Sequence, residues 1–114
     1  MDKKLKNILF LDIETVPLTE HYDEVDERLK PLWDRKASFL DGEKSPEQVY
    51  QRAGIYAEFG KIIAISVGFF YEQGSVLRLK VKSFSGDDEK VILQDFVSLL
   101  EKYNQKKLQL CAHN

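Results

Sequence analysis

The stretch Lys6-Asn7-Ile8-Leu9-Phe10-Leu11-Asp12-Ile13-Glu14-Thr15 places two carboxylates directly behind an apolar run. Ile8 to Leu11 are hydrophobic without interruption, which predicts a strand over residues 6–12 that is buried on both faces. Asp12 and Glu14 follow where the run stops, and side chains two positions apart in a strand share a face about 6–7 Å apart. Buried like charges need compensation, and hard cations such as Mg²⁺ or Mn²⁺ prefer oxygen ligands. The stretch therefore predicts a divalent-metal site at Asp12 and Glu14.

The composition of the chain is that of one globular domain. Its 114 residues, 43% hydrophobic and 32% charged, are enough for one core. The net charge of −2 disfavours broad coating of nucleic acid, but it allows a local acidic site where a cation supplies the positive charge. No apolar stretch approaches the about 20 residues of a membrane helix, and no signal-type segment precedes the first strand. Together with the single cysteine, Cys111, these features predict a cytoplasmic protein with no membrane partner.

The connection between the first two strands is long and helical in character. Residues 19–57 show helical spacing, and Pro31 inside that pattern implies a break or a new first turn near it. Ser45-Pro46-Glu47-Gln48 has the residues of a capped helix start. Trp33 is expected to pack against these helices. Because connections of this length are often functional, we expect this insertion to form one wall of a substrate channel.

The rest of the chain alternates strand and helix signals. In order, these are a strand over residues 61–71, a hairpin turn at Glu72-Gln73-Gly74-Ser75, a strand over 76–84, a helix that opens at 85–89 and ends at Asn104-Gln105, and a strand over 107–113. In the strand over 76–84, one face carries Leu77, Leu79 and Val81, and the other carries Arg78, Lys80 and Lys82. This alternation predicts a half-exposed strand at a sheet edge.

These elements predict an α/β fold with one mixed sheet. The first three strands form an antiparallel meander, and the helix returns the chain so that the fourth strand lies parallel to the first by a right-handed crossover. The sheet order is then 3-2-1-4, with the helical insertion between strands one and two. Since α/β sheets place their sites at such a switch in connectivity, Asp12 and Glu14 are expected to meet His113 and Asn114 there.

Several motifs of the chain, in this order, resemble one enzyme family. Phe10-Leu11-Asp12-Ile13-Glu14-Thr15 resembles the first motif of the DEDD (DnaQ-like) 3′–5′ exonucleases, whose core has a ribonuclease H-like fold. Gly60-Lys61-Ile62-Ile63-Ala64-Ile65-Ser66-Val67 is similar to the second-strand signature in the exonuclease domain of family-B DNA polymerases. Leu110-Cys111-Ala112-His113-Asn114 resembles the start of the second motif. Leu32-Trp33-Asp34 and Arg52-Ala53-Gly54-Ile55-Tyr56-Ala57-Glu58-Phe59-Gly60 resemble a bacterial stand-alone group related to that domain.

The resemblance implies two-metal phosphodiester hydrolysis with Mg²⁺ or Mn²⁺. Asp12 would bridge both cations, and Glu14 would bind the cation that carries the attacking water, whose pKa the metal lowers. The backbone around Thr15 and Val16 would contact the terminal sugar and base, and Asn114 would help to position the strand. The substrate would be the 3′ end of single-stranded DNA or RNA, and each terminal nucleotide would leave as a 5′-monophosphate.

The same resemblance implies residues that these 114 do not contain. They are a second-motif aspartate beyond Asn114 and a third motif with a final aspartate and a tyrosine or histidine. We therefore expect residues 1–114 to be the N-terminal portion of a single 3′–5′ exonuclease domain, with a ribonuclease H-like sheet truncated before strand five and little activity alone. A sheet left uncovered in this way is expected to self-associate.

Plainer interpretations of the same residues stay open. Asp12 and Glu14 are also compatible with loop acids after a buried strand, and the fold with a non-catalytic nucleic-acid-binding or regulatory module. A phosphotransfer domain of the actin-like kind is disfavoured, because no glycine-rich hairpin follows the carboxylates. Cys111 is typical of a small core hydrophobe, and His113 of a structural residue.

Overall fold

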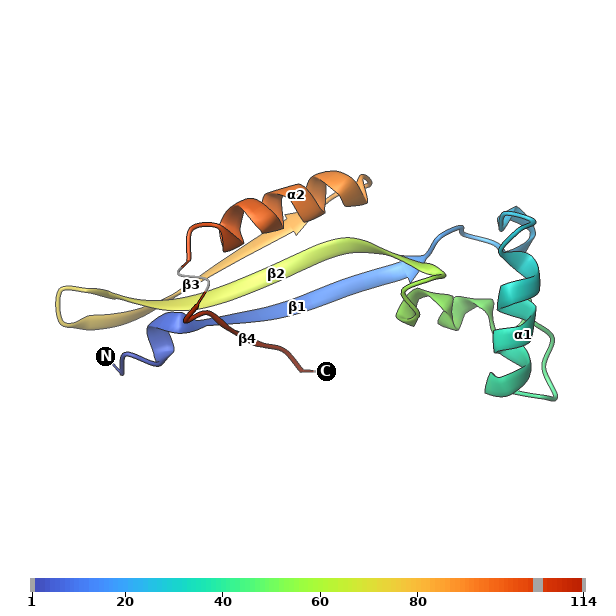
Figure 1. Ribbon diagram of the computed structural model, residues 1–114, viewed down its shortest axis with the longest axis horizontal. Helices are drawn as coiled ribbons and strands as arrows, with labels where there is room; N and C mark the ends of the chain where they lie inside the picture. The colour runs from blue at the N-terminus through green and yellow to red at the C-terminus, as the bar shows by residue number, and fades with distance from the viewer. Residues whose placement is uncertain (1, 104–105, 114) are drawn as a thin grey trace. The chain divides into compact units, whose positions relative to one another are not determined.

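Two compact units make up the chain in the computed structural model, which describes residues 2–103 and 106–113. The sheet unit comprises Met1–Glu14 and Ile62–Asn114, and the insertion unit comprises Thr15–Lys61. The strands are β1 (Ile8–Pro17), β2 (Gly60–Gln73), β3 (Val76–Ser85) and β4 (Gln109–Cys111), and the α-helices are α1 (Lys30–Leu40) and α2 (Glu89–Leu100) (Figure 1). Short 3₁₀ helices cover Leu5–Asn7, Tyr22–Glu24 and Tyr50–Ile55.

The described residues form one mixed sheet in the order β3-β2-β1-β4, which confirms the predicted order. β1 and β4 are parallel, with Ile8 opposite Gln109 and Phe10 opposite Cys111. β2 and β3 are antiparallel and joined by the two-residue turn Gly74-Ser75. Gly74 has φ of 64° while Ser75 keeps a negative φ, the pattern of a type II′ hairpin turn, in which glycine avoids the cost of positive φ. β1 is thus an inner strand, with β2 on one side and β4 on the other.

One face of the sheet is covered by α2 (Figure 1). Buried side chains from three strands and the helix form its core, namely Leu9, Ile65, Val67, Phe84 and Ile92. The helix packs on this core through Phe96, Leu99 and Leu100, and Tyr103 beyond its end packs there too. Asp88 caps the helix, since its Oδ1 accepts a hydrogen bond of 3.0 Å from the Lys90 N–H. Glu89 Oε2 accepts a 2.6 Å hydrogen bond from the Ile62 N–H of β2, which ties the helix start to the sheet.

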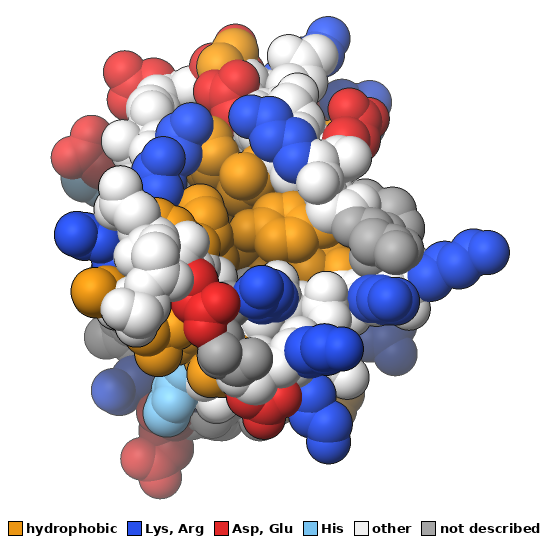
Figure 2. All heavy atoms as spheres, turned by 90° about the vertical axis from the view of Figure 1, so that its left-hand side faces the viewer, with side chains coloured by type: hydrophobic (Ala, Val, Ile, Leu, Met, Phe, Trp, Pro, Cys, Tyr) orange, Lys and Arg blue, Asp and Glu red, His pale blue; other side chains and the backbone are white. Residues whose placement is uncertain are grey.

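The opposite face, hereafter the open face, carries apolar side chains that remain exposed. The registers place Ser66 opposite Ser83, Gly68 opposite Val81, and Phe70 opposite Leu79 on this face. Phe10 of β1 meets Phe70 edge to face, with ring centroids 5.9 Å apart. The predicted edge position of β3 is confirmed, but Leu79 is 55% exposed and Val81 66% exposed, so the prediction that only half of the strand is exposed is wrong. Figure 2 views the sheet unit from the side of its β2–β3 turn, where hydrophobic side chains show between lysines and arginines.

The insertion unit has a closed aromatic core. Trp33 is fully buried, as expected from the sequence, and its Nε1–H donates a 2.9 Å hydrogen bond to the Pro46 carbonyl. Tyr50 and Phe59 meet the Trp33 ring edge to face, with centroids 5.8 and 5.2 Å away. The rest of the buried cluster consists of Val25, Ala37, Val49 and Ala53. Pro31 lies in the first turn of α1, as predicted, where its missing N–H costs no hydrogen bond.

Several predicted boundaries are wrong. β1 continues to Pro17 rather than ending at residue 12, because the β-branched Ile13, Thr15 and Val16 extend the strand. The capping hydrogen bonds between Ser45 and Gln48 form, yet the helix that follows is a 3₁₀ helix over Tyr50–Ile55. The helix α2 ends at Leu100, where hydrogen bonds to carbonyls three residues back replace the α pattern. The predicted helix end at Asn104-Gln105 lies outside the described residues, and β4 is shorter than the predicted 107–113.

None of the described helices is both long and apolar enough to cross a membrane.

Candidate functional site

Asp12 and Glu14 lie within β1, and both side chains are exposed. Only Leu9 in this strand is fully buried, so the prediction that the carboxylates follow a strand buried on both faces is wrong. Asp12 lines a shallow apolar depression of about 420 Å³ on the open face, together with Phe10, Ser66 and Phe70. Because side chains alternate along a strand, Glu14 projects from the same face as Asp12. The structure therefore brings the two predicted ligands to one side of an inner strand.

The two carboxylates have no partners within the part of the chain that the structure describes. Across residues 2–103 and 106–113, no side-chain hydrogen bond or ion pair reaches Asp12 or Glu14, and no group of three histidine, cysteine, aspartate or glutamate side chains is placed to hold a metal. Magnesium commonly keeps several waters and takes one or two carboxylates from the protein. The carboxylate oxygens of Asp12 and Glu14 are the donors that hard divalent cations prefer, and the described residues place no third such ligand beside them.

The residues predicted to meet the carboxylates from β4 are only partly placed. β4 runs parallel beside β1 as predicted, but the pairing ends at Phe10 and Cys111, two residues before Asp12. His113 follows the end of β4 and is exposed, and Asn114 lies outside the described residues. Cys111 is exposed rather than a core residue, because β4 is an edge strand. The described residues therefore supply no ligand from β4.

Thr15 and Val16 continue β1 into the insertion unit. Val16 is held by a close backbone approach: a Cβ on Gly54 would lie 2.9 Å from the Val16 carbonyl carbon, so the 3₁₀ helix needs glycine there. Gly60 in turn approaches Gly54, since a Cβ on Gly60 would lie 2.6 Å from the Gly54 carbonyl oxygen. These contacts fix the backbone at Val16, the position that the resemblance assigns to the terminal nucleotide.

Val16 also lines a depression of about 460 Å³ within the insertion unit, and sequence reasoning missed the residues around it. Its polar lining residues are Thr19, Glu20, His21, Gln51 and Lys61. Thr19 is fixed by Tyr50, whose hydroxyl lies 2.7 Å from Thr19 Oγ1. The available sequence signal is the presence of Gly54 and Gly60, because glycine allows two backbones to approach closely. It does not identify Gln51 or Lys61, which come from separate elements.

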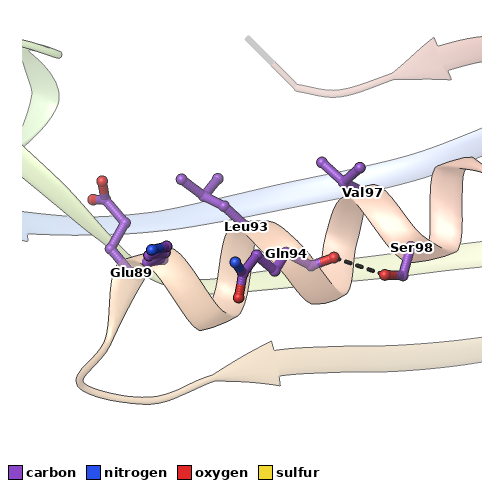
Figure 3. Close-up of a pocket in the computed structure, with 6 residues that line it drawn as sticks. Glu89, Leu93, Gln94, Val97 and Ser98 are labelled. Atoms are coloured by element: carbon purple, nitrogen blue, oxygen red, sulfur yellow. Dashed lines mark hydrogen bonds between the residues drawn. The ribbon is translucent and has the colours of Figure 1, made fainter.

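A third depression follows the outer side of α2 and offers less chemistry. Leu93 and Val97 point to the same side of the helix, next to Gln94 and Ser98 (Figure 3). The Ser98 hydroxyl donates a 3.0 Å hydrogen bond to the Gln94 carbonyl, and Glu89 is engaged with β2. Substitutions on this surface of α2 therefore provide controls for substitutions at the other depressions.

Comparisons of this chain with family models, curated proteins and solved structures found no match.

Proposed function

We propose that this chain contributes to a metal-dependent 3′–5′ exonuclease that removes 3′-terminal nucleotides from DNA or RNA. The observation that supports the proposal is the position of Asp12 and Glu14 on one exposed face of the inner strand β1, with β4 parallel beside it. A bound divalent cation at such a site lowers the pKa of a water molecule and neutralises charge on a phosphate. The fold that we propose is the ribonuclease H-like sheet, in agreement with the strand order 3-2-1-4.

Each site residue has a role in this proposal. Asp12 and Glu14 hold Mg²⁺ or Mn²⁺ through their carboxylate oxygens. Thr15 and Val16 present backbone to the terminal sugar and base, and Asn114 positions the strand. Because the chain supplies two of the four carboxylates that the resemblance implies, we expect metal binding to be weak and trimming by the 114 residues alone to be slow or absent.

Binding of Mn²⁺, followed by the electron paramagnetic resonance signal of the free ion, tests the metal site. Asp12→Asn and Glu14→Gln are expected to weaken binding about tenfold or more, because each removes one of two anionic ligands. Asp95→Asn is the matched control, since Asp95 is an exposed carboxylate of α2 in the same unit. Equal Mn²⁺ binding by all four proteins would show that Asp12 and Glu14 are ordinary surface acids.

A nuclease assay with 3′-labelled single-stranded DNA and Mg²⁺ tests the activity. Robust trimming that Asp12→Asn abolishes would establish the exonuclease and overturn the expectation of low activity for this chain. A second candidate function is a non-catalytic nucleic-acid-binding or regulatory module. It is favoured by the finding that Asp12 and Glu14 stand without a third ligand among the described residues. DNA binding without any Mn²⁺ binding at Asp12 and Glu14 would support that module.

A further inference from the structure

The outer face of α1 exposes an aromatic and an aliphatic side chain beside two cations. Phe39 is 79% exposed and Leu32 is 56% exposed, although both belong to a helix whose Trp33 and Ala37 are buried. Helical spacing brings Leu32, Arg35, Lys36 and Phe39 together on one side. With Glu58 and Phe59 they line a depression of about 430 Å³, entirely within the insertion unit. We call this set of six residues the α1 surface.

The charges of the α1 surface favour an anionic partner. Arg35 and Lys36 contribute two positive charges and Glu58 one negative charge. No ion pair to Arg35 occurs among residues 2–103 and 106–113, and the Lys36 ammonium lies 4.4 Å from the centre of the Tyr56 ring. Asp34, the acid of this helix, accepts a 2.6 Å hydrogen bond from the Tyr22 hydroxyl and is not part of the surface. The guanidinium of Arg35 is therefore available to an anion from solution.

We propose that the α1 surface binds single-stranded nucleic acid. A base stacks on the exposed ring of Phe39, and Arg35 and Lys36 contact the flanking phosphates. Stacking on aromatic side chains beside cations is how proteins hold single strands without reading their sequence. An uncharged apolar partner would cover Leu32 and Phe39 but would leave Arg35 and Lys36 without a counter-charge. The inference rests on the proposed function and deepens it, because it assigns a surface of the insertion unit to the body of the substrate strand.

Fluorescence anisotropy with a 5′-fluorescein-labelled oligo(dT) of 20 nucleotides, in EDTA and at low salt, tests this proposal. Phe39→Ala is expected to weaken binding about 5- to 100-fold, the range for loss of one stacked base. Arg35→Gln combined with Lys36→Gln is expected to weaken binding and to lower the slope of log K against log salt by about 1.4, since each lost phosphate contact removes about 0.7. Glu58→Gln is expected to tighten binding, because it removes the one negative charge of the α1 surface.

Control variants come from the depression on α2 (Figure 3). Val97 is 49% exposed there beside Lys90, so Val97→Ala truncates an exposed apolar side chain and Lys90→Gln removes a cation on another helix, and both are expected to leave binding unchanged. The fluorescence of the buried Trp33 reports the fold of the insertion unit in each variant. Since Phe39 is 79% exposed, Phe39→Ala is expected to leave that signal unchanged.

Three results would overturn the proposal. These are absence of oligonucleotide binding by the wild type, unchanged binding by Phe39→Ala with the Trp33 signal intact, and weaker binding by Glu58→Gln. Because EDTA removes divalent cations, this binding test does not depend on a metal at Asp12 and Glu14. Loss of Mn²⁺ binding in Asp12→Asn with no effect of Phe39→Ala leaves the proposed function standing and removes the α1 surface. A Phe39 effect without any Mn²⁺ binding at Asp12 and Glu14 keeps the α1 surface and removes the exonuclease.

Discussion

The insertion unit and the sheet unit differ in how they enclose their buried apolar side chains. The insertion unit packs the rings of Tyr50 and Phe59 against Trp33 and gives its indole N–H a carbonyl partner. The sheet unit closes only the face under α2, where Leu9, Ile65 and Ile92 are buried. On its open face Leu77, Leu79 and Val81 are each about half exposed or more. The shorter segment therefore encloses an aromatic cluster, while Leu32, Phe39 and Ile55 on its own surface stay exposed.

This difference shows where each unit obtains its stability. Burial of apolar surface contributes about 25 cal/mol per Å², so a residue at the centre of a closed core contributes far more than one on an open face. The insertion unit depends on interactions within itself. The open face of the sheet unit contributes little until another surface covers it. Substitutions in the closed core should therefore change the free energy of unfolding, and substitutions on the open face should change association between copies.

The largest expected effect is that of Trp33→Ala. The substitution removes the ring around which Tyr50 and Phe59 pack, and loss of a fully buried aromatic side chain costs about 3–5 kcal/mol. Hydrogen exchange should show lost protection over α1 and the 3₁₀ helix Tyr50–Ile55, while the amides that pair β2 with β3 keep theirs. Equal loss of protection in both units would show that the insertion unit does not hold its core independently.

The sequence predicted the strand order because its signals are local and strong. Gly74 marks the hairpin, and the apolar runs mark β1 and β2. The crossover through α2 then leaves β4 beside β1. Asp12 and Glu14 were also found, because alternation along one strand places them on one face. In each of these cases a single segment carries the information.

Features that depend on contacts between distant segments were not predicted. The open face of β3 has the same alternating pattern as a half-buried strand, and only the absence of a covering layer among the described residues leaves Val81 exposed. Ser45 and Gln48 form capping hydrogen bonds ahead of Tyr50–Ile55, but that segment is a 3₁₀ helix whose Gly54 approaches the backbone of Val16. The hydrogen bond from Ile62 to Glu89 joins two elements, and no local pattern indicates it.

An intermediate effect is expected for the hydrogen bond between Tyr22 and Asp34 in the insertion unit. The Tyr22 hydroxyl donates to Asp34 Oδ1 over 2.6 Å. This bond first, then burial and the charge of Asp34, raise the pKa of Tyr22 from 10.0 to about 12. The folded state holds the Tyr22 proton more tightly than the unfolded state does. The contribution of this interaction to the free energy of unfolding is therefore complete below pH 10 and is lost as the pH rises to about 12. Denaturation at pH 9 to 12 measures the free energy of unfolding, and ultraviolet titration of tyrosinate measures the pKa of Tyr22.

Tyr22→Phe provides the control for this pH dependence. The variant is expected to lose about 1 kcal/mol of stability at neutral pH, because a hydrogen bond to a charged acceptor disappears at a partly exposed site. Its stability should then fall less between pH 10 and 12 than that of the wild type. A parallel fall in both proteins would assign the alkaline loss to groups other than Tyr22.

The smallest effect on the free energy of unfolding is expected for Val81→Lys on the open face. Val81 is 66% exposed, so the substitution should change stability by no more than about 0.5 kcal/mol. It should instead change association, because we expect two copies to bury their open faces against each other, and a lysine there places a charge in the contact. Sedimentation velocity should show association of the wild type at high concentration and at least about tenfold weaker association of the variant, since a buried valine contributes about 1.5 kcal/mol per copy.

Val91→Lys, the same change on α2 at a residue 49% exposed, should associate like the wild type. A monomeric wild type at high concentration, or equal dissociation by Val91→Lys, would show that the open face is not the contact and that the two units differ in packing alone.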